Sequence, residues 1–132
     1  MNMTVTNCDT GNVILSNTQF DDGLLTFAGA GTVKSGTLLA RDSVSGKFVP
    51  FVKGGTTNGN GVVKAIMTYD VTATGAGDKS IRPAIAGEFR KERLIIAADG
   101  NATNVDAAVL DAMRDYGLVA ISVKQLAAYD NQ

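Results

Sequence analysis

The sequence predicts a single, mainly β domain with one short amphipathic helix. The 132 residues include fifteen glycines and only two prolines, a composition that favours short strands joined by tight turns. The apolar runs are brief and are separated by glycine-rich segments, and only one segment repeats its apolar residues every three or four positions. A chain of this length suits one globular unit.

The first strands are predicted from a hairpin pattern. Residues 37–41 and 47–52 are rich in apolar side chains and flank the five-residue turn segment 42–46, which is the spacing of a β-hairpin. The GGTTNGNG segment at residues 54–61 follows. Because glycine and asparagine tolerate the backbone angles of turns, we expect this segment to be a second connection.

Two longer strands are predicted in the second half of the chain. Residues 62–72 read as one strand, and their continuous apolar start predicts burial on both faces there. After a turn at residues 75–78, residues 80–89 alternate as a second strand. Pro83 cannot donate a backbone hydrogen bond, so we expect it at an edge or a bulge. Residues 94–97 form a short run that we expect to be buried.

One helix is predicted before a last strand. Thr103 or Asn104 is expected to cap it, Asp106 lies in its first turn, Arg114 in its last, and Gly117 has the place of a left-handed residue that ends a helix. Its apolar stripe is expected to pack on the sheet and consists of Val105, Ala108, Val109, Ala112, Met113 and Tyr116. Residues 118–123 are predicted as the final strand, followed by a polar tail at 124–132 with Leu126 and Tyr129 as candidate anchors.

Residues 1–35 are predicted to be an N-terminal arm, and residues 36–132 the β-rich domain. The apolar clusters of the arm are short and have no clear period, and Gly29–Gly31 follows them as a hinge. We therefore expect the arm to gain order on a partner, although the same residues could form one or two strands of the domain. The candidate binding residues of the arm are Val13, Ile14, Leu15, Phe20, Leu24, Leu25 and Phe27.

Several classes of function are disfavoured by composition. The chain contains no histidine, so the usual base of serine and cysteine nucleophiles is absent. A net charge of −1 provides no field to attract nucleic acid or a membrane surface, and no apolar run is long enough for a membrane span. Met1–Asn12 has no features of an export signal, so we expect the protein to stay in the cytoplasm where it is made.

No enzymatic or cofactor chemistry is predicted. The lone Cys8 has no disulfide partner in the chain and no neighbouring base. Asp21 with Asp22, and Glu88 with Glu92, are paired carboxylates that a hydrolase could use. Nothing nearby in the sequence would tune their pKa values for acid–base work, so solvent exposure explains them better.

From Gly36 onward, the order of features resembles the lambda type of bacteriophage head decoration protein. The matching stretches are GTLLARD at 36–42, KFVPF at 47–51, GTTNG at 55–59 and GVVKAI at 61–66. Further matches are AGEFRKERL at 86–94 and the closing segment VAISV at 119–123. This chain differs from that family in having no tryptophan, a longer N-terminal segment and an extra polar C-terminal tail.

The resemblance implies a β-clip-like domain that serves as a capsid cement. In that family, three copies form a knob at the quasi-threefold positions of an expanded tailed-phage head, and the N-terminal arm joins a strand of the major capsid protein. It also implies that the protein is on the outer surface of the virion, is not an enzyme and has no cofactor. Together with an apparent excess of apolar surface, it suggests Phe48, Phe51 and Ile95 as candidates for the trimer interface.

One alternative comes from a second resemblance. Residues 31–39 (GTVKSGTLL) are also similar to the hairpin of SAF-type β-clip domains, which occur in sugar-modifying enzymes and pilus proteins. The alternative function is therefore that of a domain that binds a small ligand or carbohydrate. Such a domain would have a concave pocket into which several polar groups converge, whereas a decoration protein would have flat faces.

Overall fold

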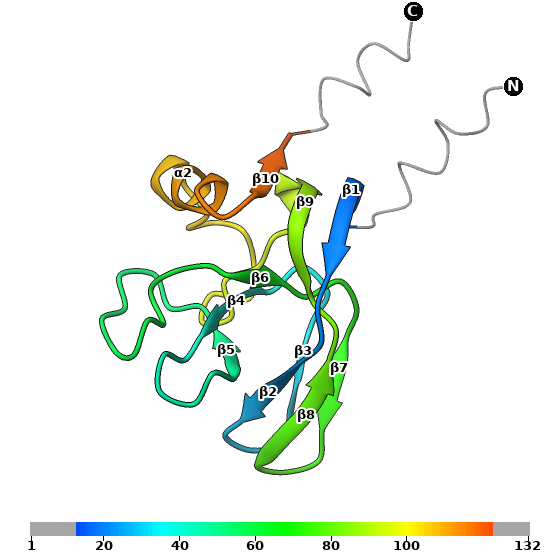
Figure 1. Cartoon of the computed structure of the whole chain (residues 1–132), viewed down its shortest axis with the longest axis vertical. Helices are drawn as coiled ribbons and strands as arrows, with labels where there is room; N and C mark the ends of the chain where they lie inside the picture. The colour runs from blue at the N-terminus through cyan, green and yellow to red at the C-terminus, as the bar shows by residue number, and fades with distance from the viewer. Residues whose placement is uncertain (1–12, 123–132) are drawn as a thin grey trace, which may run out of the picture.

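The computed structural model describes residues 13–122 and is mainly β, as the sequence predicts. Its described strands are β1 (Ile14–Phe20), β2 (Gly23–Phe27), β3 (Gly31–Val33), β4 (Leu38–Arg41), β5 (Phe48–Pro50), β6 (Ala65–Ile66), β7 (Val71–Ala73), β8 (Gly77–Ile81), β9 (Ala84–Arg90) and β10 (Leu118–Ile121). The described helices are the short 3-10 helix η1 (Lys91–Arg93) and the helix α2 (Ala107–Arg114). Figure 1 labels the strands and α2.

Most of the strands form one curled sheet. Its order is β1-β9-β6-β4-β5-β2-β8, and β10 joins it by pairing in parallel with β9. The remaining strands, β3 and β7, pair with each other in a small antiparallel sheet. The start of β1 and the end of β10 lie at the same end of the molecule, far from the turn between β7 and β8 (Figure 1).

The predicted hairpin at residues 37–52 is confirmed. Strands β4 and β5 are antiparallel, with Arg41 opposite Phe48. The turn between them is held by Asp42, whose carboxylate Oδ1 accepts hydrogen bonds from the backbone N–H groups of Val44 and Ser45 at 2.8 and 3.1 Å. An aspartate that bonds the backbone two residues ahead stabilises a tight turn without help from the rest of the fold.

Both long strands predicted in the second half are interrupted. Residues 62–72 contain two strands, because β6 pairs with β4 in the large sheet whereas β7 pairs with β3 in the small one. Between them, the Asp70 carboxylate accepts a hydrogen bond from the Ser35 backbone N–H at 2.8 Å. Residues 80–89 are likewise divided at Arg82 and Pro83 into β8 and β9. Their alternating pattern continues across the break, so sequence periodicity could not reveal it.

Two hydrophobic cores lie on opposite faces of β4 and β6. Leu38 and Ile66 belong to a core beneath α2, while Leu39 and Ala65 belong to a second core within the curl of the sheet. Successive side chains of a strand point to opposite faces, so one strand contributes to both cores. This arrangement explains the apolar run predicted to be buried on both faces, where Val63, Ala65, Ile66 and Met67 are all buried.

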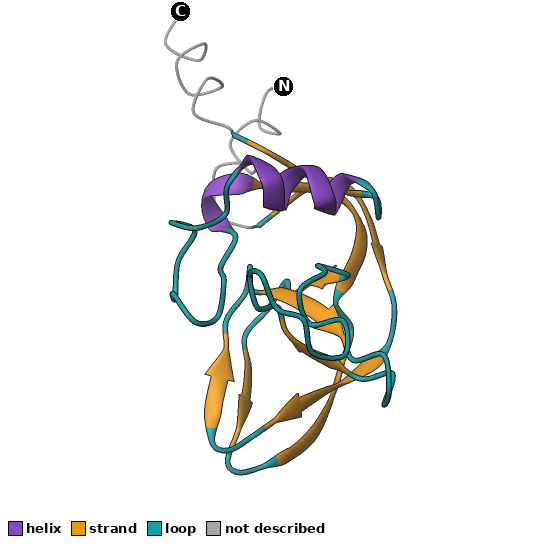
Figure 2. Cartoon of the chain, turned by 90° about the vertical axis from the view of Figure 1, so that its left-hand side faces the viewer, coloured by secondary structure: helices purple, strands orange, loops and turns teal. Residues whose placement is uncertain are grey.

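Helix α2 lies across one end of the molecule above the curled sheet (Figure 2). Its N-cap is Asp106, rather than Thr103 or Asn104, and the Asp106 carboxylate accepts a hydrogen bond from the Val109 N–H at 3.1 Å. Gly117 has a φ of +83°, as predicted for a helix end. Val105, Val109 and Met113 are buried, whereas the other residues of the predicted stripe, Ala108, Ala112 and Tyr116, are exposed.

The assignment of all residues 1–35 to an arm is corrected for residues 13–35, which contribute three strands to the domain. Strand β1 pairs with β9, β2 lies between β5 and β8, and β3 pairs with β7. These strands lack a sequence period because β1 is irregular, with three register shifts along β9, and β3 is only three residues long. Residues 1–12 lie outside the described part of the chain.

Candidate functional site

The apolar residues predicted to bind a partner divide into core and surface side chains. Val13, Leu25 and Phe27 are at most 7% exposed and belong to the two cores. Their burial shows that these three side chains stabilise the subunit itself. The other four lie nearer the surface: Ile14 and Leu15 are half-buried, and Phe20 and Leu24 are 38% and 39% exposed.

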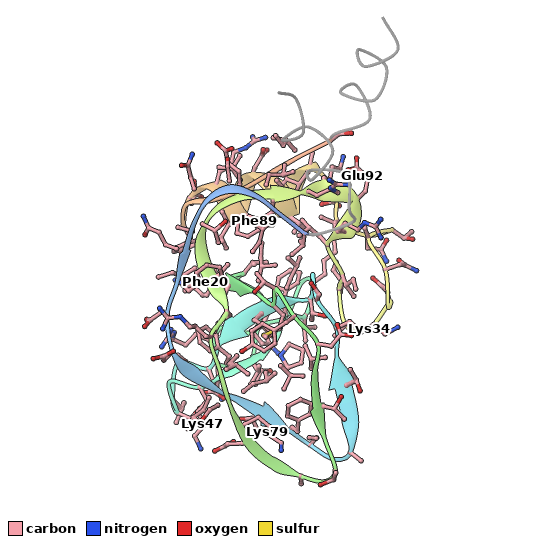
Figure 3. The ribbon with its side chains drawn as sticks, turned by 90° about the vertical axis from the view of Figure 1, so that its right-hand side faces the viewer. Phe20, Lys34, Lys47, Lys79, Phe89 and Glu92 are labelled. Carbon is pink, nitrogen blue, oxygen red and sulfur yellow. The ribbon has the colours of Figure 1, made fainter. Side chains whose placement is uncertain are left out.

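Phe20 is the more exposed of the predicted binding residues in β1, and it lies at the end of that strand. Phe20 is opposite Ala84 of β9, and it is seen at the outer side of β1 in Figure 3, whereas Phe89 of β9 points into the interior. The neighbouring Asp21 N–H donates a hydrogen bond to the Pro83 carbonyl at 3.2 Å. This bond fixes the end of β1 against the break between β8 and β9.

Strand β1 forms an edge of the sheet. It pairs with β9 along one side, and no described strand pairs with its other side. Its sequence, ILSNTQF, contains no charged residue and no proline. Edge strands of stable monomers commonly carry such residues, because they discourage pairing with another chain.

The opposite edge of the sheet has charged residues. Strand β8 contains Asp78 and Lys79, and Lys47 donates a hydrogen bond from Nζ to the Asp78 carboxylate at 2.7 Å. Figure 3 shows Lys47 and Lys79 together at the end of the molecule remote from Glu92. The hydrogen bond from Lys47, followed by one from the Thr26 hydroxyl, holds the pKa of Asp78 below its usual value.

The three candidates for the trimer interface are placed differently from expectation. Phe48 is fully buried in the core within the sheet, and Phe51 is 4% exposed in the core beneath α2. These two rings are packed inside their own subunit and offer no exposed surface to another copy. Ile95 is half-buried and borders two surface depressions. The apparent excess of apolar surface therefore came from side chains that the curled sheet covers.

The paired carboxylates have structural partners. The Glu88 carboxylate accepts a hydrogen bond from the Ser16 hydroxyl across β1 and β9, and Asp22 forms an exposed ion pair with Arg82 at 2.8 Å. Within residues 13–122, no three Asp, Glu, Cys or His side chains are grouped in a way that could hold a metal ion. None of the helices in this part of the chain has the length and apolarity needed to cross a membrane.

The surface depressions are open and have mixed linings. One of about 460 Å³ is bordered by Asp22, Tyr69 and Arg82, and one of about 410 Å³ by Lys34 and Asp70 among others. In each, a polar group is already engaged within the subunit: Asp22 bonds Arg82, and Asp70 bonds the Ser35 backbone. In both depressions, polar groups of the lining are therefore bonded within the subunit.

Comparison with known proteins identifies the family. No curated protein matches the chain. A family model described as bacteriophage lambda head decoration protein D matches residues 4–118, which includes β1, the hairpin, the break at Pro83 and helix α2. Because this match covers most of the sequence, the chain belongs to the bacteriophage lambda head decoration protein D family and has the phage capsid as its place of action.

Proposed function

We propose that this protein is a cement that binds as a trimer at quasi-threefold sites on the outer surface of a tailed-phage head and stabilises the expanded capsid. Its partner is the major capsid protein of the same phage. Membership of the decoration family supports this role. The protein acts as a structural component without catalysis or a cofactor.

The observation that carries the proposal is the uncharged edge strand β1. An exposed edge binds an added strand through backbone hydrogen bonds, so affinity does not require special side chains. Strand β1 forms such an edge, and the half-buried Leu15 together with the exposed Phe20 gives an incoming strand apolar surface to cover. The contrast with charged β8 indicates that the two edges have different roles.

Residues 1–12 precede this edge strand in the sequence, and the family match includes residues 4–12. We assign the capsid contact to this N-terminal segment together with the outer edge of β1. The predicted arm is thereby shortened from 35 residues to twelve, since the strands that follow are needed by the domain. Three linked copies would multiply individually weak contacts by avidity.

Stabilisation of the capsid follows from mass action. A ligand that binds the intact expanded shell, and not its separated subunits, lowers the free energy of the intact state by an amount that grows with the logarithm of the free ligand concentration above the Kd. The temperature at which shells rupture should therefore rise with the free concentration of the protein. Shells that rupture at the same temperature with and without saturating protein would contradict the cement function.

The edge assignment is tested by two variants that leave the domain complete. Deletion of residues 1–12, and Gln19→Lys on the exposed part of β1, should each weaken binding to expanded capsids by about tenfold or more, because the first removes contacts and the second places a charge on the edge. Thr74→Lys, in the remote turn between β7 and β8, is the matched control and should bind normally. Co-sedimentation with capsids measures binding, and circular dichroism verifies folding.

The capsid contact at the β1 edge and the trimer are tested separately. If both variants bind capsids as well as the unaltered protein, the contact lies elsewhere on the subunit and the edge assignment is wrong. Light scattering of the free protein and imaging of decorated capsids test the trimer. Single subunits scattered over the lattice would refute it.

A further inference from the structure

The loop between β5 and β6 contains both Asn-Gly pairs of the sequence (Figure 1). They are Asn58 with Gly59 and Asn60 with Gly61. An asparagine amide is chemically labile, because the backbone nitrogen of the next residue can attack its Cγ atom. Glycine in the next position favours this attack, since it has no side chain to hinder it and its backbone is flexible. The two pairs share this chemistry, so a difference between their reactivities must come from the structure.

Asn60 is half-buried and is held by several contacts. Its side-chain Oδ1 accepts a hydrogen bond from the Thr57 N–H at 3.2 Å, and its own N–H donates to the Thr57 carbonyl at 3.0 Å. Its carbonyl accepts a hydrogen bond from the Val52 N–H at 2.9 Å. A Cβ atom at Gly55 would lie 2.9 Å from Cγ of Asn60, and one at Gly61 would lie 2.2 Å from the Gly55 carbonyl oxygen. The reacting groups of this pair are therefore closely packed and cannot reorient without breaking these contacts.

Asn58 and Gly59 lie at the exposed tip of the same loop. Their φ angles are +48° and +80°, and the hydrogen bond from the Asn60 N–H to the Thr57 carbonyl encloses them in a type I′ turn. In the described part of the chain, no hydrogen bond holds the Asn58 side chain or the Gly59 N–H. Asn58 is fixed through its carbonyl, which accepts a hydrogen bond from the Ser43 N–H at 2.9 Å. Its amide and the attacking nitrogen can therefore approach each other without losing a bond of their own.

We propose that Asn58 is a site of spontaneous deamidation in the folded protein, whereas Asn60 is protected. The Gly59 nitrogen forms a bond to Cγ of Asn58, and the bond from Cγ to Nδ2 breaks. The amide group leaves as ammonia and takes the proton that the Gly59 nitrogen loses. Water then opens the succinimide ring at either carbonyl, which leaves aspartate or isoaspartate at position 58. Water is the only co-reactant, and the reaction is independent of the capsid contact at β1.

The two Asp-Gly pairs of the sequence can form the same ring with loss of water, but their carboxylates are engaged. Asp22, before Gly23, forms an ion pair with Arg82 at 2.8 Å. Asp99, before Gly100, accepts a hydrogen bond from the Asn104 side-chain amide at 2.9 Å. Asn58 thus differs from the other three side chains that precede glycine in this way, because no bond in the described chain restrains it.

The two products change the loop differently. Aspartate adds a negative charge but leaves the main chain intact, so the Ser43 N–H can still bond the carbonyl of residue 58. In isoaspartate, the main chain runs through the former side chain and is one methylene longer. The former main-chain carbonyl then belongs to a carboxylate outside the main chain. Conversion to isoaspartate should therefore loosen the loop from the turn between β4 and β5.

Deamidation rates in the folded protein and in the peptide 54–64 test the proposal. The peptide lacks the contacts of the fold, and both of its asparagines precede glycine, so they should react at similar rates. In the intact protein at mildly alkaline pH, Asn58 should react at least about tenfold faster than Asn60, because the contacts of Asn60 raise its barrier. Trypsin cleaves after Lys53 and Lys64, and tandem mass spectrometry of the released peptide locates the product. Incubation in heavy-oxygen water distinguishes it from deamidation during digestion.

Equal rates at the two asparagines of the folded protein would overturn the proposal. The proposal would also fail if Asn58 were unreactive in the protein under conditions in which it reacts in the peptide. Asn58→Gly, which suits the positive φ of the turn, is the control. It should remove the faster reaction and leave the slow rate at Asn60 unchanged.

Hydrogen exchange at the Ser43 amide measures the structural consequence. Exchange should be several-fold faster in the isoaspartate form than in the unaltered protein, because the bond to the main-chain carbonyl of residue 58 is lost. Asn58→Asp is the matched control for the added charge and should leave the Ser43 exchange slow. An isoaspartate form with unchanged exchange at Ser43 would show that the loop keeps its contact and would contradict this consequence.

Discussion

Gly23 and Gly36 show how single residues allow distant parts of the chain to meet. A Cβ atom at Gly23 would lie 2.5 Å from Cε2 of Phe48, so the absent side chain makes room for that ring. Gly36 has a φ of +97°, and a Cβ there would lie 1.9 Å from the Arg93 carbonyl oxygen. Its own N–H and carbonyl bond Met67 and Ile95. A side chain at either position would separate segments that the fold brings together.

The buried Phe48 gives the first prediction at this scale. Phe48→Ala should lower the free energy of unfolding by about 3–5 kcal/mol, because it removes a ring from a closely packed core and leaves a cavity. The loss should be independent of protein concentration, since the ring packs within one subunit. Val44→Ala is the control: Val44 is 80% exposed, so the change should be within about 0.5 kcal/mol. Urea unfolding at two protein concentrations measures both, and a loss that grows on dilution would restore Phe48 to an interface.

Among the elements, helix α2 depends on a junction with the loop after β5. Asp106 both caps the helix and pairs with Lys53. The hydrogen bond from Lys53, followed by that from the Val109 N–H, holds the pKa of Asp106 below its usual value of 3.8. The pair is exposed to solvent, so its attraction is screened by salt. The cap bond and the ion pair act at the same carboxylate and should weaken together on protonation.

The pH dependence of stability tests this junction. A lowered folded-state pKa means that the contribution of Asp106 is complete above the unfolded value near 3.8 and is lost as the pH falls through the lower folded value. Asp106→Ala should therefore be less stable than the unaltered protein at pH 7, and the difference should shrink as the pH falls below 3.8. Asp106→Asn retains a capping oxygen and should be affected less. Thermal unfolding across this pH range measures the difference, and a difference that is constant with pH would contradict the assignment.

In the whole molecule, the strands before Lys34 are part of the closure of the sheet. Strand β1 pairs with β9, and β2 pairs with both β5 and β8. Val13, Leu25 and Phe27 are buried in the two cores. Loss of these strands would leave β8 and one side of β9 unpaired and would remove three side chains from the two cores. The twelve residues before Val13 are the only part of the predicted arm that can be removed without opening the described cores.

Truncation tests whether the arm ends before Val13 or extends to residue 35. A chain that begins at Val13 should fold with nearly unchanged stability, whereas one that begins at Lys34 should fail to unfold cooperatively, because it has lost three strands and three buried side chains. Circular dichroism during thermal unfolding measures both. A cooperative transition in the shorter chain would show that residues 13–33 are dispensable and would return the whole of residues 1–35 to the arm.

The sequence alone determined the features whose physical cause is local. The hairpin follows from the turn chemistry of Asp42 and the flanking apolar residues, and the end of α2 from the left-handed conformation of Gly117. The order of short motifs from Gly36 onward was sufficient to identify the family. The absence of histidine likewise disfavours common catalytic chemistry whatever the fold, because it is a property of composition.

Only the tertiary structure decided which strands are edges and which apolar residues are covered. From the sequence, Phe48 and Phe51 were candidates for the trimer interface. Both are buried, and their burial depends on strands far away in sequence, such as β2 and β8. The irregular β1 has no period to reveal it, because its shape is set by pairing with β9, about seventy residues later. Local chemistry fixes turns and helix ends, whereas burial and edge position depend on long-range pairing, which no short segment of sequence encodes.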